Sequence, residues 1–427
     1  MPEARGWPAR RGGPTEWIYA FRSYDMTDPH ASQLRRTPLT GVHERLGATL
    51  TGFAGWLMPL RYGSETAEHN AVRTAAGLFD LSHMGEITVT GPGAAAALDY
   101  AVTGQPSALA PGRARYTMIC APDGGIIDDL IVYRLADAEF LVVANAANTR
   151  AVFQALTGRA AGRGARVTDR TADYALIAVQ GPNAEPLLAP VTKADVPSAA
   201  ARPEGTSGGI GDLRYYAICP ATVAGCQVLA ARTGYTGEDG FELFVPAEQA
   251  ERAWDGLMAA GSGSGLRPAG LAARDTLRLE AGMPLYGSEL GPDVTPFDAG
   301  LGRVVSFGKP GDFVGRAALE QRAQSAPQRE LVGLAGRSRR VPRHGYGVLW
   351  DGNRCGTVTS GAPSPTLGLP IAMAYVEAGV ARQARTASPE PRPGEPDGGD
   401  SGRLAVDIRG SAEPAGLVPL PFYRRPS

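Results

Sequence analysis

The chain has 427 residues, which is long enough for two or three domains with a large buried core. Its formal net charge is −1, so the composition lacks the basic footprint that marks nucleic-acid or anionic-membrane binding. No apolar run approaches the roughly 18 residues that are needed to span a bilayer. We therefore predict neither a nucleic acid nor a membrane as a partner.

The four cysteines are Cys120, Cys219, Cys226 and Cys355, and no two of them form a C-x-x-C pair. This spacing favours free core thiols in a reducing compartment. The predicted location is cytoplasmic, or the mitochondrial matrix if the source is eukaryotic.

Residues 1–37 are predicted to form a disordered N-terminal extension. The first 25 residues contain several Arg but also Glu3 and Glu16, and they lack the continuous apolar core of a secretory signal. A mitochondrial transit peptide is the weaker alternative, because acidic residues are unusual in one. Met26 is a second candidate for the true start of the chain.

Residues 52–60 predict a short strand or loop with apolar anchors. Ser64 is placed to cap a helix that runs to about Ala76, with Gly77 as its stop. His83 follows without a Cys, Ser or metal-ligand partner at a useful spacing, so a structural role is favoured over a catalytic one.

A pattern of strand, Gly-Pro and helix occurs twice, at residues 87–93 and 177–183. The first copy superficially fits a dinucleotide fingerprint. However, Pro92 lies between the glycines, and no strand-terminal acidic residue follows about twenty residues on. The repeat, with Pro at an early helical position, instead predicts two related α+β units.

Residues 123–125, Asp-Gly-Gly, have strong turn chemistry because Gly accepts positive φ without steric cost. The β-branched run at 126–133 then predicts a strand leaving this turn. Its predicted partner is a strand that Tyr116 opens.

Two carboxylates, Asp128 and Asp129, lie inside that apolar run. Because side chains alternate across a strand, Asp129 shares a face with Ile131 and Tyr133, and Asp128 points the other way. We therefore do not expect an acid/base dyad. One carboxylate is predicted to be solvated or to cap the turn, and the other to face whatever covers the sheet. This stretch alone leaves open whether both are turn-associated or one is held toward a ligand.

Residues 140–145 predict another strand, ending at Asn145, and residues 248–260 predict an amphipathic helix. Past Gly315 the chain changes to short strands with Gly and Pro turns, which predicts a C-terminal β domain over residues 315–427. Within it, residues 388–402 are rich in Pro, Gly and acidic residues and predict a flexible hairpin tip.

The densest motif covers residues 231–243, where three glycines within seven residues predict a tight loop. Glu242 follows in a strand and faces opposite to Phe241 and Leu243. A buried carboxylate at this place requires a cation or paired N–H donors. A structural ion pair and a ligand contact both remain open.

Arg274 and Arg278 lie four residues apart on a helix predicted over residues 271–281, on the face that also carries Asp275. Like charges at this spacing repel by roughly a few tenths of a kcal/mol. The arrangement is explained if this face looks into a cavity that contains carboxylates, from Glu242 or from a ligand, since Arg presents a fork suited to such oxygens. A solvated face is the alternative.

The chain also carries, in this order, Gly-Trp-Leu-Met-Pro at 55–59, Asp80 with Ser82-His83-Met84-Gly85, and the segments 111–116, 124–133, 233–243, 273–290, 356–361 and 421–423. These motifs, spread from about Pro38 to Arg425, resemble those of the aminomethyltransferase, or T protein, of the glycine cleavage system. Several independent motifs in the family's order make this resemblance specific.

The resemblance implies an α+β fold, a three-domain cloverleaf around a central folate cavity. Two α+β antiparallel-sheet units are expected within residues 38–314, and a C-terminal β-barrel or jelly-roll-like domain within 315–427. The implied enzyme takes an aminomethyl group from the lipoyl arm of its partner, H protein. It transfers the carbon to its co-substrate tetrahydrofolate and releases ammonia. No metal is implied.

By motif position, the resemblance implies that Asp129 is the catalytic carboxylate. It implies that Glu242 accepts hydrogen bonds from the pteridine ring, with Arg274 assisting. The other expected folate- or substrate-binding residues are Tyr116, Ile131, Tyr133, Asn145, Tyr235 and Tyr423.

The sequence departs from the family at Arg303, where many members carry Trp, and at an acidic insertion near residue 395. Two rival functions remain. One is a related folate-dependent enzyme that demethylates another amine or a sulfonium compound. The other is a non-catalytic folate-binding assembly factor for iron–sulfur proteins, whose Lys-Gly-Cys-Tyr-x-Gly signature this sequence lacks.

Overall fold

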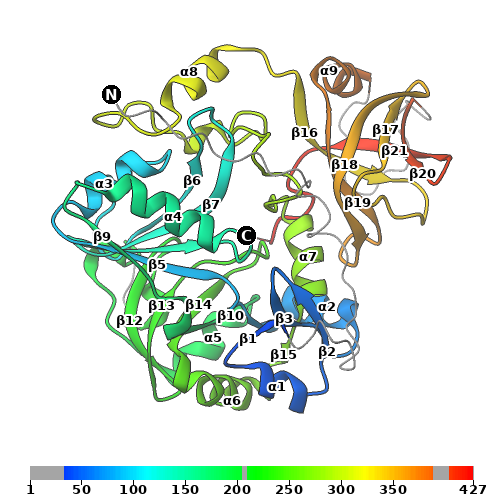
Figure 1. Ribbon diagram of the computed structural model, residues 1–427. Coiled ribbons are helices and arrows are strands. Elements are labelled where there is room, and N and C mark those ends of the chain that lie inside the picture. Colours follow the sequence, from blue (N-terminus) through cyan, green and yellow to red (C-terminus); the bar gives the residue numbers. More distant parts are fainter. Residues whose placement is uncertain (1–32, 204–208, 388–402, 427) are drawn as a thin grey trace.

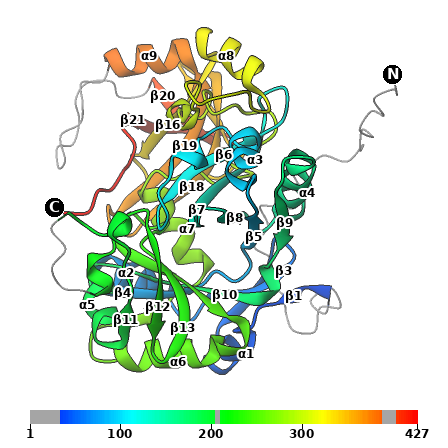
Figure 2. The same ribbon diagram turned by 90° about the vertical axis from the view of Figure 1, so that its left-hand side faces the viewer.

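The computed structural model describes residues 33–203, 209–387 and 403–426. Three lobes surround the helix α7, Leu271–Glu280, which lies near the centre in both views (Figure 1, Figure 2). Two lobes are built on β-sheets covered by helices, and the third is a β-barrel. The predicted α+β cloverleaf is therefore confirmed.

The first lobe contains a five-stranded antiparallel sheet in the order β6-β7-β8-β5-β9. Apolar side chains of α3 and α4 pack on one face of this sheet, against Ile87, Val132 and Val142. The elements are β5 Gly85–Thr90, α3 Ala94–Ala101, β6 Ala114–Cys120, β7 Ile126–Ala136, β8 Glu139–Ala144, α4 Thr149–Ala160 and β9 Arg166–Asp169.

The second lobe contains a seven-stranded sheet in the order β11-β12-β13-β14-β10-β4-β15. The sheet is antiparallel except for the parallel pair β15–β4. Helices α5 and α6 cover one face through Leu187, Trp254 and Leu257. The elements are β4 Ala76–Asp80, β10 Tyr174–Gln180, α5 Ala184–Leu188, β11 Thr192–Ala194, β12 Ile218–Val223, β13 Cys226–Ala231, β14 Gly240–Pro246, α6 Ala250–Gly261 and β15 Leu266–Pro268.

The uncovered faces of these two sheets pack against each other. Tyr133 and Val143 of the first sheet share one buried cluster with Ala178 and Phe244 of the second. Because residues two apart on a strand share a face, Asp129 lies on this inter-sheet face of β7 with Ile131 and Tyr133. Glu242, paired with Ala178, lies on the same inter-sheet face of β14. The fold thus directs both predicted site carboxylates between the sheets.

The third lobe is a closed barrel in the order β16-β19-β18-β17-β20-β21, which confirms the predicted C-terminal β domain. Helix α7 contacts strand β18 and so links the barrel to the rest of the chain. The elements are β16 Arg329–Gly336, β17 Gly347–Trp350, β18 Asn353–Ser364, β19 Leu369–Glu377, α9 Ala378–Ala387, β20 Leu404–Ile408 and β21 Ser411–Val418.

A small sheet in the order β1-β3-β2 and two helices complete the N-terminal part. Their bounds are β1 Arg35–Arg36, α1 Thr40–Arg45, β2 Thr49–Phe53, β3 Trp56–Arg61 and α2 Glu65–Thr74. Residues 35–37 are ordered here, since β1 pairs with β3 and the Thr37 hydroxyl donates to Asp80 at 2.7 Å. The disorder predicted for these three residues is therefore wrong. Residues 1–32 and the predicted hairpin tip at 388–402 lie outside the described residues.

The helix predicted from Ser64 begins as expected, because the Ser64 hydroxyl accepts the N–H of Ala67. It ends at Thr74, however, and Gly77 lies inside β4 instead of stopping a helix. A Cβ on Gly77 would approach a methyl group of Val72 to 2.4 Å. Close packing of strand against helix therefore requires glycine at this position.

Both Gly-Pro motifs follow a strand and precede a helix, as predicted. Gly91 and Gly181 adopt positive φ of 110° and 137°. The helices begin two residues after each proline, at Ala94 and Ala184, so the prolines precede the helices instead of occupying early helical positions.

The boundary at residues 314/315 stays a prediction. The first barrel strand begins at Arg329. Before it, α8, Arg316–Gln324, packs Leu319 in one cluster with Met118 and Ile126 of the first lobe. No helix within the described ranges is long and apolar enough to cross a membrane.

Candidate active site

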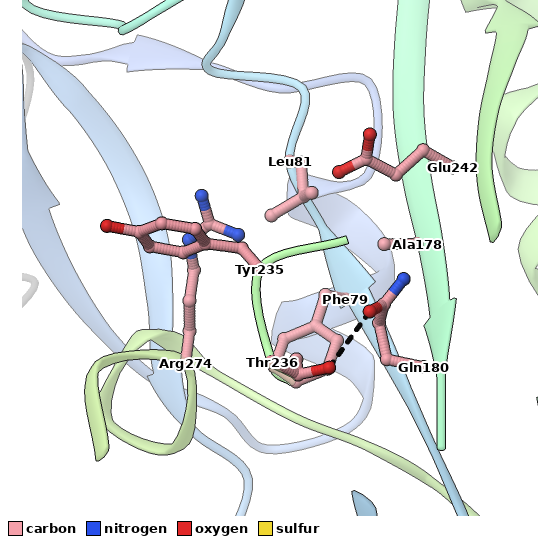
Figure 3. Close-up of a pocket in the computed structure, with 8 residues that line it drawn as sticks. All are labelled: Phe79, Leu81, Ala178, Gln180, Tyr235, Thr236, Glu242 and Arg274. Atoms are coloured by element: carbon pink, nitrogen blue, oxygen red, sulfur yellow. Dashed lines mark hydrogen bonds between the residues drawn. The ribbon is translucent and has the colours of Figure 1, made fainter. Parts of the chain in front are cut away.

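A small pocket opens beside the seven-stranded sheet. Figure 3 shows the Glu242 carboxylate on one side and the Tyr235 ring with the Arg274 guanidinium on the other. The lining residues are Phe79, Leu81, Ala178, Gln180, Tyr235, Thr236, Glu242 and Arg274. Three of the predicted site residues thus meet in one pocket.

Glu242 reaches this pocket because β14 alternates its side chains. Phe241 and Leu243 are fully buried in the core on the opposite face. Thr233 donates its hydroxyl proton to a Glu242 oxygen at 2.5 Å. Burial raises the pKa of Glu242, while Thr233 and the charge of Arg274 lower it in part. Within the described chain no cation lies in salt-bridge contact with Glu242, so this carboxylate has capacity for further N–H donors.

Arg274 and Tyr235 form the opposite wall. The guanidinium carbon lies 4.7 Å from the centroid of the Tyr235 ring, a cation–π contact. The Tyr235 hydroxyl donates to the carbonyl of Pro284, which fixes the ring. Burial lowers the pKa of Arg274 and raises that of Tyr235. The result is a flat, rigid, cationic surface facing a carboxylate.

Asp129 is the centre of a second group, formed by the strand β7 and its two neighbours. The Tyr116 hydroxyl donates to one Asp129 oxygen at 3.0 Å, and the Asn145 amide donates to the other at 2.8 Å. Burial raises the pKa of Asp129. Asp129 does not line the pocket described above, but its charge raises the pKa of the pocket residue Tyr235, after the larger effect of burial.

The surroundings of Asp128 differ from those predicted. It points away from Asp129, as predicted, but it neither caps the turn nor reaches solvent, because it is 0% exposed. The turn is instead capped by Asp123, which accepts the N–H of Gly125 at 3.0 Å. The Asn145 amide nitrogen donates to both Asp128 and Asp129, each at 2.8 Å, so the two carboxylates are coupled despite their opposite faces.

The remaining predicted residues lie around these two groups. Tyr133 is fully buried behind Glu242, and its hydroxyl lies 3.2 Å from that of Thr233. Ile131 is partly buried in the inter-sheet cluster. Tyr423 lies outside the pocket lining, with its ring 4.1 Å from the guanidinium carbon of Arg73.

Arg278 does not share the pocket with Arg274. Its guanidinium donates to Asp275 at 2.8 Å, to Glu289 at 3.1 Å and to Ser360 of the barrel at 2.8 Å. Only the first of the two arginines therefore fits the predicted cavity-facing role. The second ties α7 to the barrel.

His83 is buried beside this region, and its ring lies edge-on to Phe53. Its Nδ1 has no hydrogen-bond partner among the residues that the structure describes. Burial, followed by the charge of Arg274, lowers the pKa of His83 to about 3. The imidazole is therefore neutral at physiological pH, in keeping with the structural role that the sequence favoured.

Three polar residues of the region were not predicted from the sequence. Gln180 hydrogen-bonds to Thr236 at 3.0 Å and lines the pocket (Figure 3). Thr233 donates a hydrogen bond to Glu242. Tyr216 adopts a positive φ of 56°, and its pKa is raised by burial and, to a smaller extent, by the charges of Glu242 and Asp129. Gln180 could have been found from the sequence, because it is a polar residue at the end of an apolar strand.

Two family models match the chain. The GCVT N-terminal domain matches residues 39–309, and the glycine cleavage T-protein C-terminal barrel domain matches residues 329–424. The gap between them contains α8. The order and extent of these matches agree with the lobes described above.

Curated relatives and a solved structure cover nearly the whole chain. The aminomethyltransferase of Streptomyces coelicolor is 58% identical over 398 residues, which is 92% of this chain and 99% of that protein. The aminomethyltransferase of Streptomyces avermitilis is 59% identical over 394 residues, 92% and 98% of the two chains. The crystal structure of glycine cleavage system aminomethyltransferase T from Bartonella henselae aligns with a TM-score of 0.77 at 35% identity, covering 92% of this chain and 99% of that one. The chain therefore belongs to the aminomethyltransferases, the T-protein family of the glycine cleavage system.

Proposed function

We propose that this transferase moves the carbon of an aminomethyl group, carried on the lipoyl arm of H protein, to tetrahydrofolate. In this proposal Asp129 is the catalytic residue, and Glu242 with Arg274 holds the pterin. The single observation that carries it is the pairing of a pocket-facing carboxylate, Glu242, with the flat Arg274–Tyr235 wall across one pocket.

The pterin edge suits Glu242 chemically. An amino-pyrimidinone ring presents two parallel N–H donors, and a carboxylate can accept both together. Thr233 fixes the orientation of the carboxylate. A flat ring also favours the aromatic and guanidinium surfaces of Tyr235 and Arg274.

The reaction breaks the carbon–sulfur and carbon–nitrogen bonds of the aminomethyl group and forms two bonds from its carbon to the folate nitrogens N5 and N10. The two folate N–H protons end on the lipoyl thiol and on ammonia. An iminium-like carbon develops positive charge on the way. Asp129 can stabilise that charge as a carboxylate, and burial, which raises its pKa, favours holding a proton.

The lipoylated H protein is the proposed partner and tetrahydrofolate the proposed co-substrate. The proposed location is cytoplasmic, or the mitochondrial matrix in a eukaryotic source. The roles of Tyr116 and Asn145 are to hold Asp129, at 3.0 Å and 2.8 Å. Tyr423 is proposed to lie near the folate tail, with Arg73 beneath its ring. Ile131 and Tyr133 are proposed to back the binding site.

The test is glycine-cleavage activity reconstituted with H protein and tetrahydrofolate. Asp129→Asn and Asp129→Ala should lower the transfer rate by about a hundredfold or more, the range expected for a proton-handling group. Folate binding should stay largely intact in both variants. Full activity in either variant would remove Asp129 from the proposed role, and folate binding without turnover in the wild type would favour a non-catalytic folate protein.

A further inference from the structure

Asp128 is a carboxylate that the proposed chemistry does not use, although it lies one residue from Asp129. It is fully buried, and its neighbours on the same face of β7 are Ile126 and Leu130, at 0% and 1% exposure. A carboxylate among aliphatic side chains costs several kcal/mol unless it is hydrogen-bonded. Asp128 therefore requires partners, and the structure supplies them from one short segment.

Three N–H groups converge on Asp128. The backbone N–H of Asn145 donates at 2.9 Å, the side-chain amide of Asn145 at 2.8 Å and the side-chain amide of Asn148 at 2.7 Å. All three lie between the end of β8 and the start of α4. Asp128 thus organises the turn that presents Asn145.

Asn145 connects this buried anchor to the proposed catalytic residue. Its amide nitrogen carries two protons, and the contacts at 2.8 Å use one for Asp128 and one for Asp129. A flipped amide would place its oxygen against two carboxylates. The anchor therefore fixes which way Asn145 points, and Asn145 fixes one oxygen of Asp129 while Tyr116 holds the other.

We propose that Asp128, held by Asn148, is a positioning residue that fixes the Asn145 amide and through it holds the Asp129 carboxylate in place for transfer. This inference rests on the proposed catalytic role of Asp129. It assigns a function to Asp128 and to Asn148, neither of which touches the pocket described above.

The relay also has an electrostatic consequence. Burial raises the pKa of Asp128 well above its ordinary value, and the charge of Asp129 raises it further, so the two carboxyl groups disfavour carrying charge together. The titratable groups that bear on the two carboxylates also include tyrosines from neighbouring elements, namely Tyr116, Tyr216, Tyr235 and Tyr286.

The test is Asp128→Asn in the full-length protein, assayed with aminomethylated H protein and tetrahydrofolate. The expected kcat is lower by about tenfold or more, because the loss of placement removes part of a proton-transfer contribution of 10²-fold or greater. Folate affinity, measured by equilibrium binding, should stay within about threefold of the wild type.

A second variant guards against misfolding of the first. Asn148→Ala keeps both carboxylates and removes one donor from Asp128, so kcat should fall a few-fold with unchanged folate affinity. The matched control is Asp99→Asn in the same lobe, which removes a carboxylate bonded to Ser107 at 2.9 Å and should leave activity unchanged.

Wild-type kcat in folded Asp128→Asn, or wild-type kcat in Asn148→Ala, would overturn the inference. An equal loss of folate binding and turnover would overturn it too, because that pattern belongs to a purely structural residue. If Asp129→Asn is inactive while Asp128→Asn is normal, only the relay fails. If Asp129→Asn is fully active, the proposed function of Asp129 itself fails.

Discussion

Glu280 and Glu242 are two carboxylates near the centre of the same molecule, but their surroundings differ. Glu280, at the end of α7, meets Arg73 at 2.8 Å and His69 at 3.2 Å, and it accepts hydrogen bonds from Ser364 and Thr366. Burial by itself would raise the pKa of Glu280. The interactions with its partners, of which the His69 hydrogen bond is the largest, outweigh burial and lower the pKa to about 2. Glu242 accepts from Thr233, and burial raises its pKa.

The difference separates a structural role from a binding role. The Glu280 cluster joins α2, α7 and the barrel, so its hydrogen bonds are satisfied within the protein. Glu242 lines a pocket, where the N–H groups of a ligand can reach its carboxylate. Variants of the two residues should therefore change different quantities, and the following predictions are ordered by expected size.

Glu280→Ala should lower the free energy of unfolding by about 3–5 kcal/mol, because it leaves Arg73 and His69 buried without their shared partner. Urea denaturation measures this loss. The control is Glu320→Ala, which removes a half-exposed pair with Arg316 and should cost at most about 0.5 kcal/mol. Comparable losses in the two variants would contradict the special role of the cluster.

The same cluster predicts a pH dependence. A carboxyl whose folded pKa lies below its unfolded value stabilises the fold above the unfolded pKa, and this stability is lost as the pH falls. For Glu280 the window runs from about 4.5 down to about 2. Glu280→Gln should flatten the stability profile in this window relative to the wild type.

Glu242→Gln should raise the KM for tetrahydrofolate about thirtyfold, since hydrogen bonds to a charged acceptor contribute about 1.5–3 kcal/mol. Its stability should change little. Glu68→Gln is the matched control, because Glu68 is buried but accepts N–H groups of Tyr62, Gly63 and Gly270. The control should lose stability and keep its folate KM. A raised folate KM in Glu68→Gln, together with an unchanged folate KM in Glu242→Gln, would contradict the binding role of Glu242.

Arg274→Lys keeps the charge and removes the planar guanidinium that lies over Tyr235. We expect the folate KM to rise about tenfold, because a lysine ammonium cannot reproduce a flat stacking surface or a bidentate fork. Steady-state kinetics with varied tetrahydrofolate measures the change. An unchanged KM would show that charge alone suffices at this wall.

Glu86→Gln should stabilise the protein by about 1 kcal/mol at pH 8, the smallest expected effect. Glu86 is 1% exposed, and neither carboxylate oxygen has a partner within the described structure. Burial, followed by the charge of Asp169, raises its pKa well above the ordinary value. A raised folded pKa makes wild-type stability fall as the pH rises, so the gain should shrink toward pH 4. Thermal unfolding at both pH values tests this sign.

Local patterns in the sequence predicted much of the fold. Alternation placed Glu242 opposite to Phe241 and Leu243, and the Asp-Gly-Gly turn placed β7 beside the strand that carries Tyr116. The end of the helix after Ser64 was predicted incorrectly, because Ala76 pairs with β15 and Gly77 pairs with β10 in a sheet whose strands are distant in sequence. Local propensity contains no information about such a pairing.

The chain by itself determined which residues carry charge, which turns they flank and, through its motifs, the family to which it belongs. Only the tertiary structure decided how those charges are paired. In the folded chain Arg278 pairs with Glu289 and with the barrel, whereas Arg274 lines the pocket. Asn145 donates hydrogen bonds to both Asp128 and Asp129 and so links them. The physical reason is that burial and hydrogen-bond partners, which set the cost and pKa of a charge, come from segments far apart in sequence.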